Sequence, residues 1–150
     1  MRLFLKQNDL LDEAEIHICY KDIYEKLQRV IEKLQLMDFS VMGRKEGAIY
    51  KIAVENIYYF ESVDDKIFAY CELDVYEVSY KLYELEEMVS EYSFARVSKS
   101  VIINIDKIKS IKPQLNGRFE AILLNEERQI VSRHYINGLR EKFIGGKKNE

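Results

Sequence analysis

The sequence predicts a mainly β protein with a few helices, an α+β fold in which antiparallel sheets predominate. Its 150 residues include 11 Tyr and 7 Phe, and aromatic side chains suit the half-buried surface of a pleated sheet. Short alternating segments follow one another across turn signals such as Asn116-Gly117, which is typical of successive hairpins. Strand–helix–strand repeats are not visible, and the length suits one core rather than two full domains.

The first 40 residues predict a small strand–strand–helix extension. Residues 2–7 and 15–20 alternate between apolar and polar side chains, as a strand does, and we expect His17 to be structural. Apolar residues at helical spacing predict a helix over residues 23–36, with Asp22 as N-cap and Glu25 completing a capping box. This helix could cover an open sheet edge or form a dimer interface.

The middle of the chain predicts two hairpins, an aromatic strand between them and one helix. Gly47 marks the turn of the first hairpin, and Leu73-Asp74 mark the turn of the second. The helix carries an acidic run, Glu84, Glu86 and Glu87, which we interpret as a solvated face. The predicted ranges are 39–44 with 48–52, 57–62, 67–72 with 75–79, and 81–90.

Residues 94–106 join a cationic, hydroxyl-rich segment to an apolar run. Arg96 and the triplet 98–100 supply the polar groups, and residues 101–105 are apolar except for Asn104. We expect the apolar run to be buried, which would hold the polar segment at the end of a core element. A short polar loop on a rigid base is suited to presenting side chains to an anion.

The last third predicts a second set of strands and a final helix. Strands are expected over residues 107–112, 119–124 and 129–131, with Asn116-Gly117 as the strongest hairpin turn in the chain. Ser132 can cap the final helix, which is expected to turn Ile136, Leu139 and Phe143 inward and to end at Gly145-Gly146.

The net charge of −3 hides an asymmetry along the chain. Residues 1–93 carry 11 Lys and Arg against 20 Asp and Glu, whereas residues 94–150 carry 12 against 6. The basic part favours nucleic-acid binding, because a local basic surface rather than the total charge binds phosphate. An equally weighted interpretation is that the two parts neutralise each other, within one molecule or across a dimer.

Several other classes of protein are disfavoured. No apolar run reaches ~18 residues, so we expect no membrane insertion. Cys19 and Cys71 are interpreted as reduced core thiols of a cytoplasmic protein. His17 and His134 lie far apart, so no metal site is expected, and without a phosphate-binding loop or a catalytic motif we expect neither a cofactor nor an enzyme.

Three polar positions stand where apolar segments meet, and each offers donors to phosphate oxygens. They are residues 64–66; Arg96 with Ser98, Lys99 and Ser100; and Ser132 with Arg133 and His134. A helix N-terminus at the third position would add backbone N–H groups, and Arg133 could read guanine through its two-pronged guanidinium. Taken singly, each position is more often a solvated loop, and Asp64 and Asp65 would oppose an anion.

Five segments resemble the LytTR family of bacterial DNA-binding domains, in the family's order and spacing. They are IYYFES at 57–62, KLYELEE at 81–87, FARVSKSVIINID at 94–106, KIKSI at 107–111 and VSRHY at 131–135. The third segment is the most specific of the five. The resemblance divides the chain into an extension at 1–40, a LytTR-type domain at 41–146 and a tail at 147–150.

The resemblance implies antiparallel sheets whose loops, rather than a recognition helix, enter successive grooves of double-stranded DNA. Carried over by position, the first loop runs from Ser62 to Lys66, the second covers Ser98, Lys99 and Ser100 after Arg96, and the third covers Ser132, Arg133 and His134. Arg133 falls at a major-groove base contact, Lys99 falls where the central loop meets DNA, and Lys66 is chosen for the first loop.

The implied protein is a bacterial transcriptional regulator, expected to act as a homodimer on repeated half-sites. About 40 residues precede the matching segments, too few for the phosphoacceptor receiver domain of many family members. The chain therefore resembles the stand-alone regulators, which often accompany a small membrane protein encoded in the same operon. The competing interpretation is a protein-interaction module without DNA binding. We expect Lys66, Lys99 and Arg133 on a single face if the protein binds DNA, and scattered positions would favour the interaction module.

Overall fold

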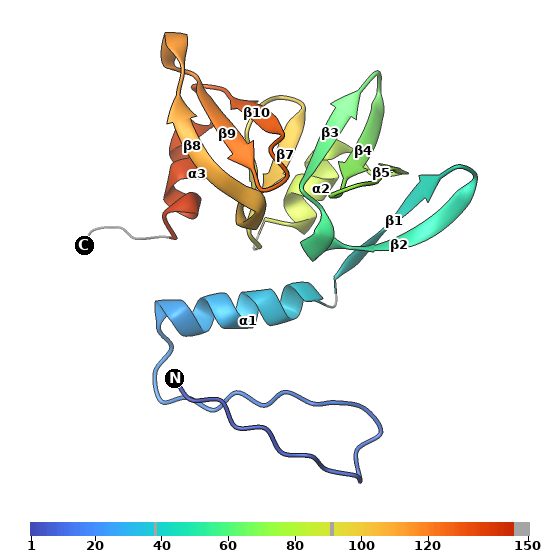
Figure 1. Ribbon diagram of the computed structural model, residues 1–150, viewed down its shortest axis with the longest axis vertical. Coiled ribbons are helices and arrows are strands. Elements are labelled where there is room, and N and C mark those ends of the chain that lie inside the picture. The colour runs from blue at the N-terminus through green and yellow to red at the C-terminus, as the bar shows by residue number, and fades with distance from the viewer. Residues whose placement is uncertain (38, 91, 146–150) are drawn as a thin grey trace.

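Two antiparallel sheets and three helices make up the computed structural model, which describes residues 1–37, 39–90 and 92–145 (Figure 1). The larger sheet has the strand order β2-β1-β5-β4-β3-β7-β6, and the smaller has the order β10-β9-β8. The strands of the larger sheet are β1 (Ser40–Lys45), β2 (Ala48–Ala53), β3 (Tyr59–Val63), β4 (Lys66–Tyr70), β5 (Val75–Val78), β6 (Phe94–Arg96) and β7 (Val101–Asn104). Those of the smaller are β8 (Ile108–Pro113), β9 (Phe119–Leu123) and β10 (Arg128–Val131). The helices are α1 (Glu25–Met37), α2 (Leu82–Met88) and α3 (Ile136–Phe143).

The predicted antiparallel α+β fold is confirmed, and so are its hairpins. Residues 45 and 48 close the β1–β2 hairpin around Gly47, and β4 pairs antiparallel with β5. The turn at Asn116-Gly117 is longer than a two-residue turn, because Pro113 pairs with Phe119 and the amide of Gln114 donates to the carbonyl of Arg118 (2.8 Å).

The centre of the larger sheet is buried on both faces. On β3, Phe60 packs into one core and Tyr59 into the other, and on β7 Ile102 and Ile103 divide in the same way. The first core includes Leu82 and Leu85 of α2, and the second includes residues of β8, β9, β10 and α3. Residues 101–105 are all buried, as predicted, so the strands that carry the central loop are held from both sides.

Asn104 is the polar interruption in this buried run, and both ends of its side chain are hydrogen-bonded. Its Nδ2 donates to the carbonyl of Ile57 (2.9 Å), and its Oδ1 accepts from the amide of Asp106 (3.0 Å). A buried amide with both ends paired costs little and fixes the register between the neighbouring segments.

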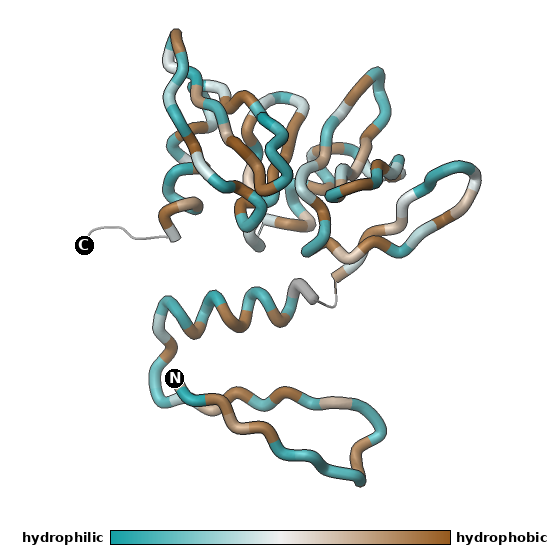
Figure 2. Tube along the Cα trace, in the orientation of Figure 1, coloured by the Kyte–Doolittle hydropathy of each residue, from teal (hydrophilic) through white to brown (hydrophobic). Residues whose placement is uncertain are grey.

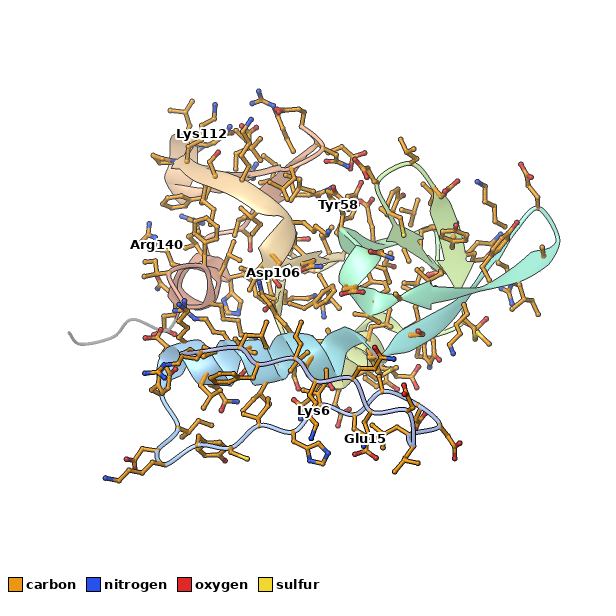
Figure 3. The ribbon with its side chains drawn as sticks, turned by 60° about the horizontal axis from the view of Figure 1, so that its bottom comes forward. Lys6, Glu15, Tyr58, Asp106, Lys112 and Arg140 are labelled. Atoms are coloured by element: carbon orange, nitrogen blue, oxygen red, sulfur yellow. The ribbon has the colours of Figure 1, made fainter. Side chains whose placement is uncertain are left out.

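The two strands predicted near the N-terminus are wrong, although the helix after them is confirmed. Residues 2–7 and 15–20 form no strand, and the side chains of Leu3, Phe4 and Leu5 are more than four-fifths exposed. Alternation produces a strand only where a sheet edge and a core are within reach. Here α1 lies between this arm, residues 1–24, and the sheets, and apolar positions along the arm stand clear of the body (Figures 1 and 2). Figure 3 shows the arm, with Lys6 and Glu15, passing alongside α1.

Four smaller predictions also fail. Helix α1 begins at Glu25 and its first bond runs from the amide of Gln28 to the carbonyl of Tyr24 (2.9 Å), so Asp22 is not the N-cap. Cys19 is exposed because the arm has no core around it, whereas Cys71 is half-buried and burial raises the pKa of its thiol to about 11. His17 was expected to be structural, but it is exposed and pairs with Glu15 (2.7 Å). Phe143 was expected to face inward, but it is 37% exposed.

Candidate nucleic-acid interface

The first candidate loop is the tight turn between β3 and β4. Val63 pairs with Lys66, and the two residues between them, Asp64 and Asp65, both have positive φ (50° and 65°). This is the backbone twist that two-residue hairpins favour, and Asp tolerates it better than most residues do. Lys66 and both carboxylates are exposed, and Ser62 is half-buried at the base of the turn.

The central loop joins β6 to β7 and is braced by Arg96. The Arg96 side chain is only 17% exposed. Its Nε donates to the carbonyl of Ser98 (2.7 Å), one terminal nitrogen donates to the carbonyl of Lys99, and the other pairs with Glu86 of α2 (2.8 Å). Arg96 therefore points back into the loop that it was predicted to flank, and a member of the acidic run on α2 helps to hold it.

Within the central loop, the serines face each other and the lysine faces outward. The hydroxyl of Ser98 accepts from the amide of Ser100 (3.2 Å), and the two hydroxyls are 3.5 Å apart. Both serines are half-buried, whereas Lys99 is exposed and has no ion-pair partner among the described residues. The loop thus presents Lys99 from a locally hydrogen-bonded turn.

The third candidate loop lies between β10 and α3. Ser132 was predicted to cap this helix, but the helix begins at Ile136 with Tyr135 as its N-cap. The Ser132 hydroxyl is buried and has no hydrogen-bond partner in the described part of the chain, so it does not face an outside ligand. Arg133 and His134 are exposed, and the His134 ring meets the Tyr135 ring edge to face at 4.9 Å.

Two backbone hydrogen bonds join the three loops. The amide of Ser62 donates to the carbonyl of Ser100 (2.9 Å), and the amide of Ser132 donates to the carbonyl of Val97 (3.0 Å). The central loop accepts both bonds, and it is anchored by Val97, which is fully buried. In Figure 1 the β3–β4 turn and the yellow β6–β7 connection stand at the same edge of the molecule. The structure therefore brings the three predicted loops together in the order first, second, third.

The β8–β9 turn is a neighbour of the third loop that sequence reasoning did not connect to it. At Gly117 a Cβ atom would lie 2.6 Å from Cδ and 2.9 Å from Cγ of Arg133, so the stem of that side chain lies directly against the glycine. The turn stands at the same edge of the molecule in Figure 1. The available signal was Asn116-Gly117 itself, which marks a turn but not the side chain that crosses it.

Charge at this edge is mixed. Lys66, Lys99 and Arg133 are exposed, and within the described residues none of them forms an ion pair. Asp64 and Asp65 oppose them at the first turn. No cluster of three or more metal-ligating side chains is present in the described ranges, and none of the helices there is long and apolar enough to cross a membrane.

Antiparallel sheets that present linked polar and cationic loops at one edge define a class of β-rich proteins suited to polyanions. The family model of the LytTr DNA-binding domain matches residues 47–144, and the chain therefore belongs to the LytTR family of DNA-binding domains.

Similar proteins agree with this assignment. The sensory transduction protein LytT of Enterococcus faecalis is 30% identical over 98 residues, which are 65% of this chain but only 40% of that protein. An uncharacterized HTH-type transcriptional regulator of Staphylococcus aureus is 24% identical over 145 residues, which are 95% of this chain and 97% of that protein. Among solved structures, a LytTr DNA-binding domain of a response regulator from Bacillus cereus superposes with a TM-score of 0.65 and 27% identity, covering 71% of this chain and 96% of that one.

Proposed function

We propose that the protein is a transcriptional regulator that binds a specific duplex site through its three linked loops, each entering a groove of the DNA. The observation that carries the proposal is the pair of backbone hydrogen bonds, Ser62 to Ser100 and Ser132 to Val97, which fix three polar loops at one edge. This arrangement favours DNA binding over the protein-interaction module, because that module does not require the three loops to be joined. The transcriptional regulator of Staphylococcus aureus among the similar proteins supports the same function.

The residues divide into three roles under this proposal. Arg133 reads a base, because its guanidinium is exposed and can form two parallel hydrogen bonds to guanine. Lys66 and Lys99 neutralise phosphates, and His134 lies beside Arg133 as a further contact. Arg96, Ser98 and Ser100 shape the central loop, and Ser62 and Ser132 join the loops through their amides.

The assembly and setting of the protein are part of the same proposal. It acts in the cytoplasm as a homodimer on repeated half-sites, together with a membrane-protein partner encoded in the same operon. The exposed apolar residues of the arm, among them Leu3, Phe4 and Leu5, give such contacts a surface. Light scattering on the full chain and on a variant lacking residues 1–38 tests the dimer, and neither the arm nor α1 has a part in it if both proteins contain the same number of protomers per particle.

Selection of bound duplexes from a random pool, followed by affinity measurements on the selected site, tests DNA binding directly. The wild-type protein should enrich one sequence. Arg133→Ala should lose about 1–3 kcal/mol of discrimination, confined to one base pair. A pool that stays random would reject sequence-specific binding in favour of the interaction module. An Arg133→Ala variant that keeps wild-type affinity and selectivity would reject only the base contact.

A further inference from the structure

We propose that the β8–β9 turn positions the base-reading residue, and that Gly117 is a positioning residue for Arg133. The inference rests on the proposed function, because it assigns a support to the side chain that reads the base. The carrying observation is that the stem of Arg133 occupies the space where any other residue at position 117 would carry its Cβ atom.

The contact involves the stem of the arginine and not its tip. A Cβ atom at position 117 would be 2.6 Å from Cδ and 2.9 Å from Cγ of Arg133, but 4.0 Å from Nε. At separations below 3 Å something must shift, and because Cγ and Cδ precede the guanidinium, moving them moves the guanidinium as well. Arg133 is exposed and forms no ion pair within the described residues, which leaves its guanidinium available to a base edge.

The backbone of the turn brings the glycine into this place. Asn116 and Gly117 both have positive φ (62° and 73°), a conformation in which side chains other than Asn and Asp are strained. The turn is anchored by β8 and β9, whose pairing continues to Pro113 and Phe119 at its base. The stem of Arg133 therefore packs against a turn that two paired strands hold, which reduces the ordering that DNA binding would otherwise require.

The chain supplies a matched control at the β1–β2 turn. Gly47 has nearly the same φ (79°), but nothing lies within 4 Å of the position of its Cβ atom. Gly47→Ala and Gly117→Ala thus introduce similar backbone strain, and only the second meets Arg133. In Figure 1 the tip of the β1–β2 hairpin lies at the right, apart from the β3–β4 and β6–β7 turns at the top.

The experiment compares the affinity of four variants for the selected duplex: Gly117→Ala, Gly47→Ala, Arg133→Ala and the double variant Gly117→Ala/Arg133→Ala. We expect Gly117→Ala to weaken binding on the order of tenfold, as loss of a base contact does, and Gly47→Ala to bind as the wild type does. In the Arg133→Ala background, Gly117→Ala should have no further effect, because a positioning residue acts only through the side chain that it positions.

Other outcomes overturn the inference at identifiable points. The positioning role is wrong if Gly117→Ala binds the duplex as tightly as Gly47→Ala does. It is also wrong if Gly117→Ala weakens binding equally in the Arg133→Ala background. In both cases DNA binding itself stands. Arg133→Ala that binds as the wild type does removes the base contact, and the positioning role with it. If Gly117→Ala fails to fold, Gly117→Asn and Gly47→Asn replace the alanine pair, because Asn tolerates positive φ and still carries a Cβ atom.

Discussion

At the scale of single residues, Arg96 and Lys99 are two cations three positions apart with different surroundings. All three guanidinium nitrogens of Arg96 form hydrogen bonds within the protein, whereas Lys99 is exposed and has no ion-pair partner among the described residues. A cation adds to the salt dependence of DNA binding only if it neutralises a phosphate. The two residues should therefore differ in the one measurement that counts phosphate contacts.

Lys99→Ala should weaken binding to every duplex and reduce the slope of log affinity against log salt by about 1. The reason is that one phosphate contact fewer releases one counterion fewer. Titrations with the selected duplex at several salt concentrations give the slope. Lys51→Ala, which removes an exposed lysine from β2, is the control and should leave it unchanged. An unaltered slope in Lys99→Ala would take Lys99 out of the set of phosphate contacts.

At the scale of elements, the brace at Arg96 predicts a structural effect instead. Arg96→Ala leaves the carbonyls of Ser98 and Lys99 without their donor, and should lower the free energy of unfolding by on the order of 2 kcal/mol. DNA affinity should fall as the loop loses its shape, with no change in the salt slope. Urea unfolding and the same titrations measure both.

The matched variant for this brace is Glu86→Gln. It removes only the ion pair with α2, in which the Glu86 side chain is 47% exposed, so its effect on stability should stay below about 1 kcal/mol. Arg96→Ala that unfolds as the wild type does but has a lower salt slope would make Arg96 a direct phosphate contact.

Elements were predictable where the chain carries a local reason for them. The buried run at 101–105 and the hairpin around Gly47 follow from hydrophobicity and turn chemistry, and both are confirmed. The wrong predictions are those whose outcome depends on distant partners. The arm at 1–24 has alternating apolar and polar residues but meets no sheet edge. Ser132 is a residue type that can cap a helix, but its hydroxyl is buried. The resemblance predicted that the three loops share one DNA-facing surface, but the bonds that join them connect residues too far apart in sequence to be foreseen.

At the scale of the whole molecule, the second core contains a pair of stacked tyrosines. The rings of Tyr59 and Tyr70, on neighbouring strands, lie 4.4 Å apart with an angle of 12° between their planes. Burial raises the pKa of both phenols, and that of Tyr59 by the larger amount. The folded protein therefore keeps these protons at a pH where the unfolded chain releases them, which begins near 10.

This coupling predicts that stability falls as the pH rises above about 10. In that range the folded state binds more protons than the unfolded state, so the free energy of unfolding has a negative slope with pH. Lys142 is an exposed residue, but partial desolvation of its ammonium group lowers its pKa, which has the opposite sign, and the comparison must therefore be with Tyr59→Phe. Urea unfolding at pH 8 and above pH 10 should show a shallower loss in Tyr59→Phe, and an identical loss would contradict the assignment.

The two hydrogen bonds that join the loops also predict that the binding edge opens as one unit. Both amides, Ser62 and Ser132, depend on carbonyls of the same short segment, Val97 to Ser100. When that segment opens, both protons lose their acceptors in one event, so in heavy water they should exchange with a common opening free energy. The edge would then behave as one cooperative unit, with exchange of the first and third loops governed by the opening of the second.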